Sequence, residues 1–307
     1  MPIAFRQAPE YLRRMNRRSF IRLTAATPLA LGQVGTLMAL EADNTYRAEI
    51  GIQLYTLRHE LEKDPAGTLK KVAAAGYKQV ELYGFPKSAA MVSAAKDAGL
   101  AINSSHFEWD TVVNPKDPEM SDFAGILEKA KEIGLSQLVI PFLKEPNRAT
   151  LDDYKKVAVH ANKAAAMSKA AGIQLSYHNH NFEFQPKDGG KSGYDVFIDE
   201  FSSDMHFEID VFWVKVAGKD PVELIQKLSG RVSQLHLKDL KADIPSPNYG
   251  SGLPKEAFKE LGNGIIPMEP IIVAAKAAGV KHCHVEQDQS PDALASIQQS
   301  IAHLKSL

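Results

Sequence analysis

Histidine and carboxylate residues recur in this sequence at the ends of successive short apolar runs. His178 and His180 close one run, Asp210 closes the next, and His236 and Glu286 end the two that follow. Charged side chains rarely enter buried strands unless they are paired or bound to a metal. Imidazole nitrogens and carboxylate oxygens from separate strands can surround one divalent ion. The pattern therefore predicts a metal site that draws its ligands from these five residues.

Other polar residues in the same segments could contact a substrate or move a proton. Lys238 follows His236 by two residues, and strand alternation places both side chains on one face. Its ammonium could stabilise an oxyanion, or it could be an ordinary exposed lysine. The further candidates for substrate contact are Glu81, His106, Trp109, Glu183, Trp213 and Asp288. Each has a structural explanation on its own, such as packing of Trp109 in its loop, so only the joint pattern carries the prediction.

A repeated unit of the chain would position these residues. Five times, an Ala-rich amphipathic stretch ends in a glycine and is followed by a short apolar run; the glycines are Gly76, Gly99, Gly134, Gly172 and Gly279. A glycine just past a helix end supplies the left-handed conformation that stops the helix. Alternation of helix and strand predicts parallel strands joined by crossover helices.

The repeat predicts eight strands and a closed barrel. The expected strands are Glu49–Tyr55, Gln79–Tyr83, Ala101–His106, Gln137–Phe142, Gln174–His180, His206–Phe212, Ser233–Lys238 and Lys281–Glu286. This number and the chain length suit a (β/α)8 TIM barrel of about 250 residues. The alternative is an open doubly wound sheet, but no Gly-x-Gly-x-x-Gly follows the first strand. In a TIM barrel the chemistry lies at the carboxyl ends of the strands, where the candidate residues occur.

The N-terminal segment predicts export. Arg17 and Arg18 precede Ser19-Phe20-Ile21, and a weakly apolar run extends from Leu23 to Leu40. A basic start, a modest apolar middle and small residues beyond it are typical of a signal peptide, and the arginine pair resembles a twin-arginine signal. The run is too polar for a stable membrane anchor. We expect residues 1–45 to be a signal peptide with a short linker, residues 46–307 to be a single barrel, and the protein to be periplasmic.

Composition narrows the classes of partner. The chain has 307 residues, of which 44% are hydrophobic and 24% charged, values typical of a soluble globular protein. Its formal charge is −1, and several of its arginines lie in the N-terminal segment, so the rest of the chain is mildly acidic. We therefore expect no nucleic-acid partner. The single cysteine, Cys283, excludes an intrachain disulfide and a Cys-rich zinc site. The oligomeric state stays open, with a homo-oligomer as one outcome.

From about residue 47 to its end, the chain resembles the sugar phosphate isomerase/epimerase superfamily of xylose isomerase-like TIM barrels. The motifs that carry the resemblance are Gly51-Ile52-Gln53-Leu54-Tyr55-Thr56-Leu57-Arg58, Val80-Glu81-Leu82-Tyr83-Gly84, Tyr177-His178-Asn179-His180, His236-Leu237-Lys238-Asp239 and Val285-Glu286-Gln287-Asp288. Members hold one divalent ion with a Glu, an Asp, a His and a Glu from strands five to eight. Asp210, His236 and Glu286 match the last three. His178 stands at the position of the strand 5 glutamate, with His180 one step outward.

The resemblance implies a metal-dependent isomerase or epimerase of a non-phosphorylated sugar or polyol. A metal-stabilised enediolate would form while Glu286 moves a proton, with His178 opposite it. Because the family uses two glutamates as opposed proton carriers, the missing strand 5 glutamate favours one-face proton abstraction. A lyase or dehydratase that acts on a 3-keto-sugar or inosose is therefore the alternative. Trp213, where many epimerases have a histidine, is a further departure. The ligand types favour Mn, Co or Zn over Mg.

Two other classes of function were weighed against a sugar-transforming enzyme. A phosphodiesterase like the AP endonucleases shares the barrel, but the acidic charge, the export signal and too few ligands for a trinuclear zinc site oppose it. A non-catalytic sugar binder would not require Asp210, His236 and Glu286 together.

Overall fold

The computed structural model describes residues 46, 49–250 and 252–307. The expected signal peptide and linker, residues 1–45, lie outside the described residues. No helix within the described part of the chain is both long enough and apolar enough to cross a membrane.

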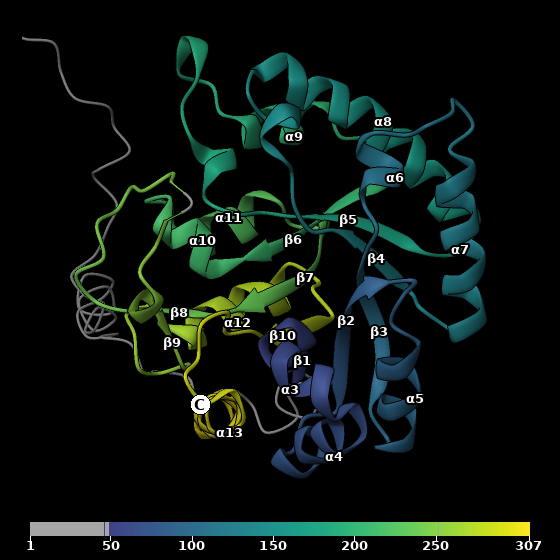
Figure 1. Ribbon diagram of the computed structural model, residues 1–307. Coiled ribbons are helices and arrows are strands. Elements are labelled where there is room, and N and C mark those ends of the chain that lie inside the picture. The colour runs from purple at the N-terminus through teal and green to yellow at the C-terminus, as the bar shows by residue number, and fades with distance from the viewer. Residues whose placement is uncertain (1–45, 47–48, 251) are drawn as a thin grey trace, which may run out of the picture. The chain divides into compact units, whose positions relative to one another are not determined.

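Eight parallel strands close into a barrel (Figure 1). Their order around the barrel is β1 (Gly51–Gln53), β10 (His282–Val285), β7 (Val232–Leu237), β6 (Met205–Asp210), β5 (Gln174–His178), β4 (Gln137–Ile140), β3 (Ala101–Phe107) and β2 (Gln79–Phe85). The predicted (β/α)8 barrel is confirmed, and the open sheet is excluded because β1 pairs with both β2 and β10. β5, β7 and β10 end one or two residues earlier than expected, so His180, Lys238 and Glu286 lie just beyond the ends of these strands.

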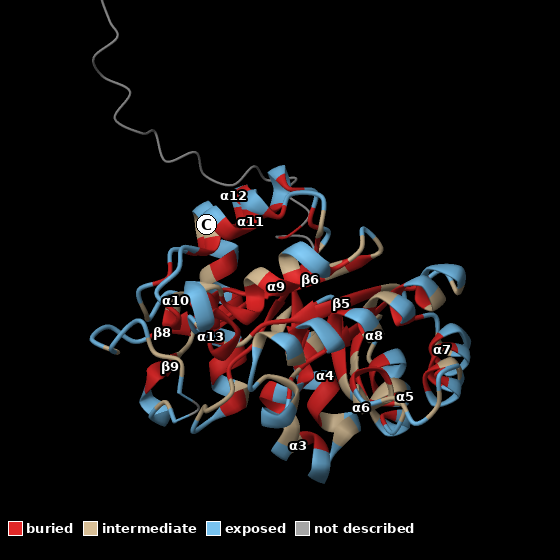
Figure 2. Cartoon of the chain, turned by 90° about the horizontal axis from the view of Figure 1, so that it is seen from above, coloured by how far each residue is buried: buried red, intermediate tan, exposed pale blue. Residues whose placement is uncertain are grey.

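Helices follow the strands and cover the outside of the barrel. They are α3 (Arg58–Lys63), α4 (Pro65–Ala75), α5 (Ala89–Asp97), α6 (Asp110–Val113), α7 (Ser121–Ile133), α8 (Leu151–Ala170), α9 (Gly193–Glu200), α10 (Val211–Val216), α11 (Pro221–Lys227), α12 (Met268–Ala277) and α13 (Ala293–Ser306). Short 3-10 helices are η2 (Leu54–Leu57), η3 (Glu145–Asn147), η4 (Phe182–Phe184), η5 (Asp188–Gly190) and η6 (Lys255–Ala257). Figure 2 shows the buried residues concentrated in the strands and the exposed ones on outer helix faces, as amphipathic helices around a core require.

Local signals fix where the helices begin and end. Thr150 and Asp153 form a reciprocal capping box at the start of α8, which satisfies two of the free amide groups of its first turn. All five glycines of the repeated unit have positive φ, and Gly76 and Gly134 are the C-caps of α4 and α7. The predicted helix–glycine–strand unit is therefore observed.

A long connection between β7 and α12 is fastened to the barrel. It contains the short antiparallel pair β8 (Asp239–Leu240) and β9 (Phe258–Lys259). The Asp239 carboxylate accepts backbone hydrogen bonds from Gly262 at 3.0 Å, Gly264 at 2.9 Å and Ile266 at 2.9 Å. These bonds hold the connection over the carboxyl end of the barrel, where it supplies part of a cavity wall.

Candidate metal and acid–base site

Four of the predicted ligands meet at the carboxyl end of the barrel. One ligand atom from each of His178, Asp210, His236 and Glu286 lies within 4.8 Å of the others, and all four residues are buried. We call these four residues the upper cluster. They come from β5, β6, β7 and the residue after β10, and Asp210 pairs directly with His236 in the β6–β7 register. Because the barrel strands are parallel, their carboxyl ends lie at the same height, and residues far apart in the sequence meet there.

The orientation of the two imidazoles fits a cation between them and the carboxylates. His178 Nδ1 donates to the Pro141 carbonyl at 3.2 Å, so its Nε2 presents a lone pair to Asp210 Oδ2 at 3.3 Å. His236 Nε2 lies 2.6 Å from Glu81 Oε2. When Nε2 donates there, the buried Nδ1 faces Glu286 Oε2 at 2.9 Å. Facing lone pairs repel unless a proton or a metal ion lies between them, and this His/Asp/His/Glu donor set suits a divalent ion.

Lys238 is buried among the carboxylates rather than exposed. Its Nζ lies 3.0 Å from Asp210 Oδ2, 2.7 Å from Glu286 Oε2 and 3.1 Å from Asp288 Oδ2. Burial opposes the charge, but the three carboxylates outweigh it and hold the pKa of Lys238 well above its ordinary value. The interpretation of Lys238 as an ordinary exposed lysine is therefore wrong, because it is 3% exposed. In the resting state the lysine therefore brings a positive charge to the site.

The carboxylates of the site differ in pKa. Burial raises the pKa of Glu286, but Lys238 and His236 outweigh it, and the net pKa is held well below the ordinary value. For Asp288, burial is the larger effect and raises the pKa to about 6 despite the nearby Lys238. Glu286 is thus ionised at neutral pH, as a proton acceptor must be.

A second layer of polar residues supports the upper cluster from inside the barrel. This lower layer consists of Glu81, Ser104, His106, Glu208 and Gln234. Gln234 Nε2 donates to Glu81 Oε1 at 2.8 Å and to Glu208 Oε1 at 2.5 Å, while His106 Nε2 lies 3.1 Å from Glu208 Oε2. Glu81 was expected to contact substrate, but it is fully buried and its oxygens bind these neighbours instead. Its carboxylate orients His236.

Sequence reasoning missed Glu208 and Gln234, although a signal for them was present. Each lies two residues before a ligand, Glu208 before Asp210 and Gln234 before His236. Alternation along a strand places such residues on the same inward face, one step deeper in the barrel. His284 relates to Glu286 in the same way and is also fully buried.

A cavity of about 680 Å³ opens above the upper cluster. Eight of the predicted site residues line it: His106, Trp109, His178, His180, Trp213, Lys238, Glu286 and Asp288. Residues that the sequence did not single out complete the wall, among them Tyr55, Tyr83, Phe142, Leu253 and Phe258. The two tyrosines are the last residues of predicted strands and could have been found there. Leu253 and Phe258 come from the long connection, whose course depends on tertiary contacts.

Two predicted residues lie elsewhere than expected. His180 lines the cavity but is outside the upper cluster, since its ring lies 5.4 Å from that of Phe182 and 5.2 Å from that of Trp213. Burial holds its pKa well below the ordinary value, so the imidazole is neutral. Glu183 is fully buried beneath the loop, where it accepts the Tyr177 hydroxyl at 2.6 Å and the His180 amide at 2.9 Å. It shapes the turn after β5 and does not line the cavity.

The barrel and the site at its carboxyl end define an enzyme that acts on sugars, with a site suited to a divalent ion. The chain belongs to the xylose isomerase-like TIM barrel family, whose model matches residues 69–307.

Individual relatives agree with this membership. An inosose dehydratase of Clostridium beijerinckii is 22% identical over 66% of this chain and 74% of its own length. The crystal structure of a sugar phosphate isomerase/epimerase from Parabacteroides distasonis is 29% identical, with a TM-score of 0.69 over 85% of this chain and 98% of that one. A zinc-bound IOLI protein shares the fold at 15% identity, with a TM-score of 0.62 over 84% of this chain and 97% of that one.

Proposed function

We propose that this protein is a lyase that eliminates water, or an equivalent leaving group, from a keto-sugar or keto-polyol. The observation that carries the proposal is the contact between Lys238 Nζ and Glu286 Oε2 at 2.7 Å. This contact places an ionised base, Glu286, next to a protonated acid, Lys238, where β7 and β10 meet the cavity. On the β5 side, the imidazole of His178 takes the place of a second carboxylate. The inosose dehydratase name of a relative supports the same reaction class.

The chain's own residues can carry out the elimination with all protons accounted for. Glu286 takes the proton from the carbon next to the carbonyl, and the C–H electrons form the double bond of an enolate. As the carbonyl re-forms, the C–O bond on the following carbon breaks. Lys238 protonates the departing hydroxide, which leaves as water. Glu286 then returns its proton to the neutral Lys238 amine, and both groups are restored.

The upper cluster, His178, Asp210, His236 and Glu286, would hold the divalent ion. When bound, the ion would act as a Lewis acid on the substrate carbonyl. Imidazole ligands beside carboxylates favour Mn, Co or Zn, with Mg as the weaker alternative. The zinc-bound relative of the same fold supports this choice. Metal analysis of the purified protein, before and after soaking in each metal, tests it.

The test of the reaction type is incubation of the metal-loaded enzyme with inososes and 3-keto-sugars in deuterated water. A lyase gives loss of water and the ultraviolet absorbance of a conjugated carbonyl. Lys238→Gln should retain deuterium exchange at the carbon next to the carbonyl while elimination is lost, because only the acid is removed. Glu286→Gln should lose both. Exchange with every hydroxyl retained would overturn the lyase proposal.

Epimerisation or isomerisation is the second candidate, and His180 is the observation that favours it. This residue presents a neutral imidazole to the β5 side of the cavity, opposite Glu286. A neutral imidazole can accept a proton from the face that Glu286 does not reach, and Glu286, once protonated from solvent, can return one on its own face. In the same experiment, an epimerase gives an inverted centre that carries one solvent deuterium, and His180→Gln abolishes the inversion but not the exchange.

We also propose that the protein is exported to the periplasm by the twin-arginine route. Arg17 and Arg18 before a weakly apolar run support this location. Replacement of both arginines by lysine should retain the protein in the cytoplasm in a fractionation experiment. Unchanged delivery to the periplasm would contradict the proposal.

A further inference from the structure

The cavity is larger than a single sugar ring requires. Its volume is about 680 Å³. At the roughly 30 Å³ that each water takes up in the liquid, a hexose of about twelve non-hydrogen atoms would need at most about 360 Å³. A monosaccharide in contact with Lys238 and Glu286 would therefore leave about half of the cavity to another group. Because this argument starts from a sugar at the upper cluster, the inference below rests on the proposed function.

The unfilled part of the cavity is aromatic. The polar residues His178, Lys238 and Glu286 are buried at the floor, whereas Tyr55, with 42% of its surface exposed, lies at the mouth. Tyr83 and Trp109, both half-buried, also line the cavity. Aromatic rings at the wet edge of a cavity offer flat apolar surface to the C–H faces of a sugar ring.

The aromatic mouth is held in place before any ligand arrives. The Tyr55 and Tyr83 rings meet edge to face, with centroids 5.7 Å apart. The Arg58 guanidinium lies 4.4 Å from the Tyr55 ring and donates to the Asp288 carbonyl at 2.8 Å. Arg58 thus ties the mouth to the loop that carries Asp288, and a ligand there would lose little free energy in ordering the wall.

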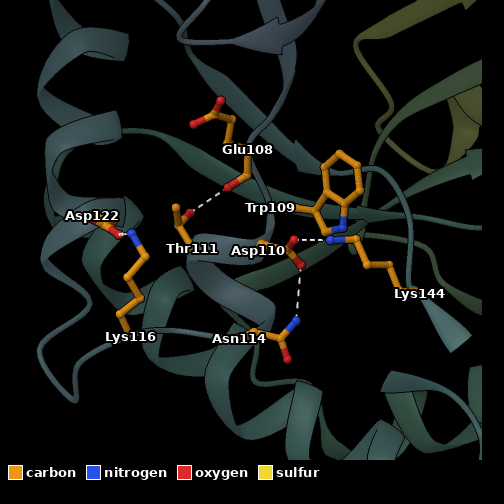
Figure 3. A pocket seen from close by; sticks show the side chains of 8 residues that line it. All are labelled: Glu108, Trp109, Asp110, Thr111, Asn114, Lys116, Asp122 and Lys144. Carbon is orange, nitrogen blue, oxygen red and sulfur yellow. Dashed lines mark hydrogen bonds and ion pairs between the residues drawn. The ribbon is translucent and has the colours of Figure 1, made fainter. Parts of the chain in front are cut away.

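Trp109 also borders a second, polar recess of about 350 Å³ (Figure 3). Around the indole, Figure 3 shows Asp110, which forms an ion pair with Lys144 and accepts a hydrogen bond from Asn114 at 3.1 Å. Thr111 and Glu108 also line the recess. An aromatic surface beside exposed carboxylate, amide and ammonium groups suits a hydroxylated ring better than an apolar one.

We propose that the substrate is a glycoside with two sugar rings. The reacting ring lies on the floor against Lys238 and Glu286, and the second ring lies in a subsite between Tyr83 and Trp109, from which its hydroxyls reach the recess of Asp110 and Asn114. Trp109 is the shared wall of the cavity and the recess. Its role is to bind the second ring, and it takes no part in the proton transfers.

The test is equilibrium binding of sugars that cannot react, so it does not depend on turnover. Glucose, maltose, cellobiose, trehalose and sucrose have no ketone beside the carbon to be deprotonated. Each is titrated into the metal-loaded protein by calorimetry. Trp109 and Trp213 are the two tryptophans of the chain and both line the cavity, so fluorescence gives a second readout. In the Trp213→Phe variant, the remaining signal reports on Trp109 alone.

At least one disaccharide should bind roughly tenfold more tightly than glucose and perturb the Trp109 fluorescence. Trp109→Ala should weaken that disaccharide roughly three- to tenfold, the range of an aromatic contact, and leave glucose unchanged. Trp109→Phe keeps a flat ring and should recover most of the affinity, which excludes a folding defect as the cause. Tyr83→Ala tests the opposite wall in the same way.

Equal affinity for glucose and every disaccharide, no binding by any of them, or an equal loss for both ligand sizes in Trp109→Ala would overturn the second subsite. Failure of the proposed function is a separate result. An enzyme that binds disaccharides through Trp109 but eliminates nothing from keto-sugars keeps the subsite and loses the reaction. An enzyme that dehydrates inososes but does not bind disaccharides keeps the proposed reaction and loses the second subsite.

Discussion

The upper cluster and the lower layer use the same residue types inside one barrel but differ in how their charges are met. In the lower layer, Glu81 and Glu208 receive donors from Ser104, Gln234 and His106. In the upper cluster, the lone pair of His178 faces Asp210, a proton or a metal ion must lie between His236 Nδ1 and Glu286, and Lys238 is the only protonated amine that the described residues bring to the carboxylates. A buried polar group without a partner costs free energy, so an arrangement of this kind persists where a ligand completes it. His236 contacts both regions, because its Nε2 lies next to Glu81 of the lower layer and its Nδ1 next to Glu286 of the upper cluster.

The largest expected effect is the loss of metal when an upper-cluster carboxylate is removed. Asp210→Ala should abolish stoichiometric metal binding, measured by elemental analysis after metal soaking. Asp210 also caps α10 by accepting the amides of Phe212 and Trp213, so its loss should lower stability by about 1 kcal/mol.

Asp220→Ala is the matched control for that cap. Asp220 accepts the amides of Val222 and Glu223 at the start of α11 in the same way, but it is exposed and does not belong to the upper cluster. It should cost similar stability and leave the metal content unchanged. Full metal occupancy in Asp210→Ala would contradict the assignment of metal binding to the upper cluster.

Glu286→Gln should lower turnover by about 10²-fold or more, because it keeps an oxygen ligand and the size of the side chain but removes the base. Steady-state rates with the keto-sugar that proves to be the substrate measure the change, and metal analysis of the same sample separates lost chemistry from lost metal. Near-normal turnover at full metal occupancy would reject Glu286 as the proton acceptor.

Glu81→Gln should weaken metal binding by about tenfold, although Glu81 is not a ligand. Its carboxylate accepts the His236 Nε2 proton at 2.6 Å and so directs Nδ1 to the upper cluster. Titration with a competing chelator measures the affinity. Glu208→Gln, whose contact with Nε2 is longer at 3.1 Å, should have the smaller effect. The reverse order would mean that Glu208 orients the ring.

An effect on stability alone, with metal binding and turnover unchanged, concerns Glu183, a buried carboxylate outside both regions. Burial raises its pKa to about 7, against an ordinary value of 4.5. The folded state therefore holds a proton that the unfolded state releases, and stability falls as pH rises from about 4.5 to 7, by on the order of 3 kcal/mol at most. Glu183→Gln should flatten the dependence of melting temperature on pH across this interval. If the slope of melting temperature against pH is unaltered, the pH dependence arises from other groups.

The sequence by itself predicted the barrel and the residues of the upper cluster, except for the choice between His178 and His180. Helix–glycine–strand spacing is a local signal, and the five glycines with positive φ show that it works within each unit. Once the strands are parallel and closed, residues at successive strand ends must share one end of the barrel. That is why His178, Asp210, His236 and Glu286 could be grouped without coordinates.

Tertiary structure alone decided how deep each side chain lies and what it contacts. Alternation tells which face of a strand a residue occupies, but its level along the barrel depends on the stagger of neighbouring strands, and the β2–β3 register shifts next to Glu81. Glu81 was therefore mistaken for a cavity residue and Lys238 could equally have been exposed. The ion pairs of Lys238 join β7 to residues on β6 and after β10, and such contacts exist only after the barrel has closed.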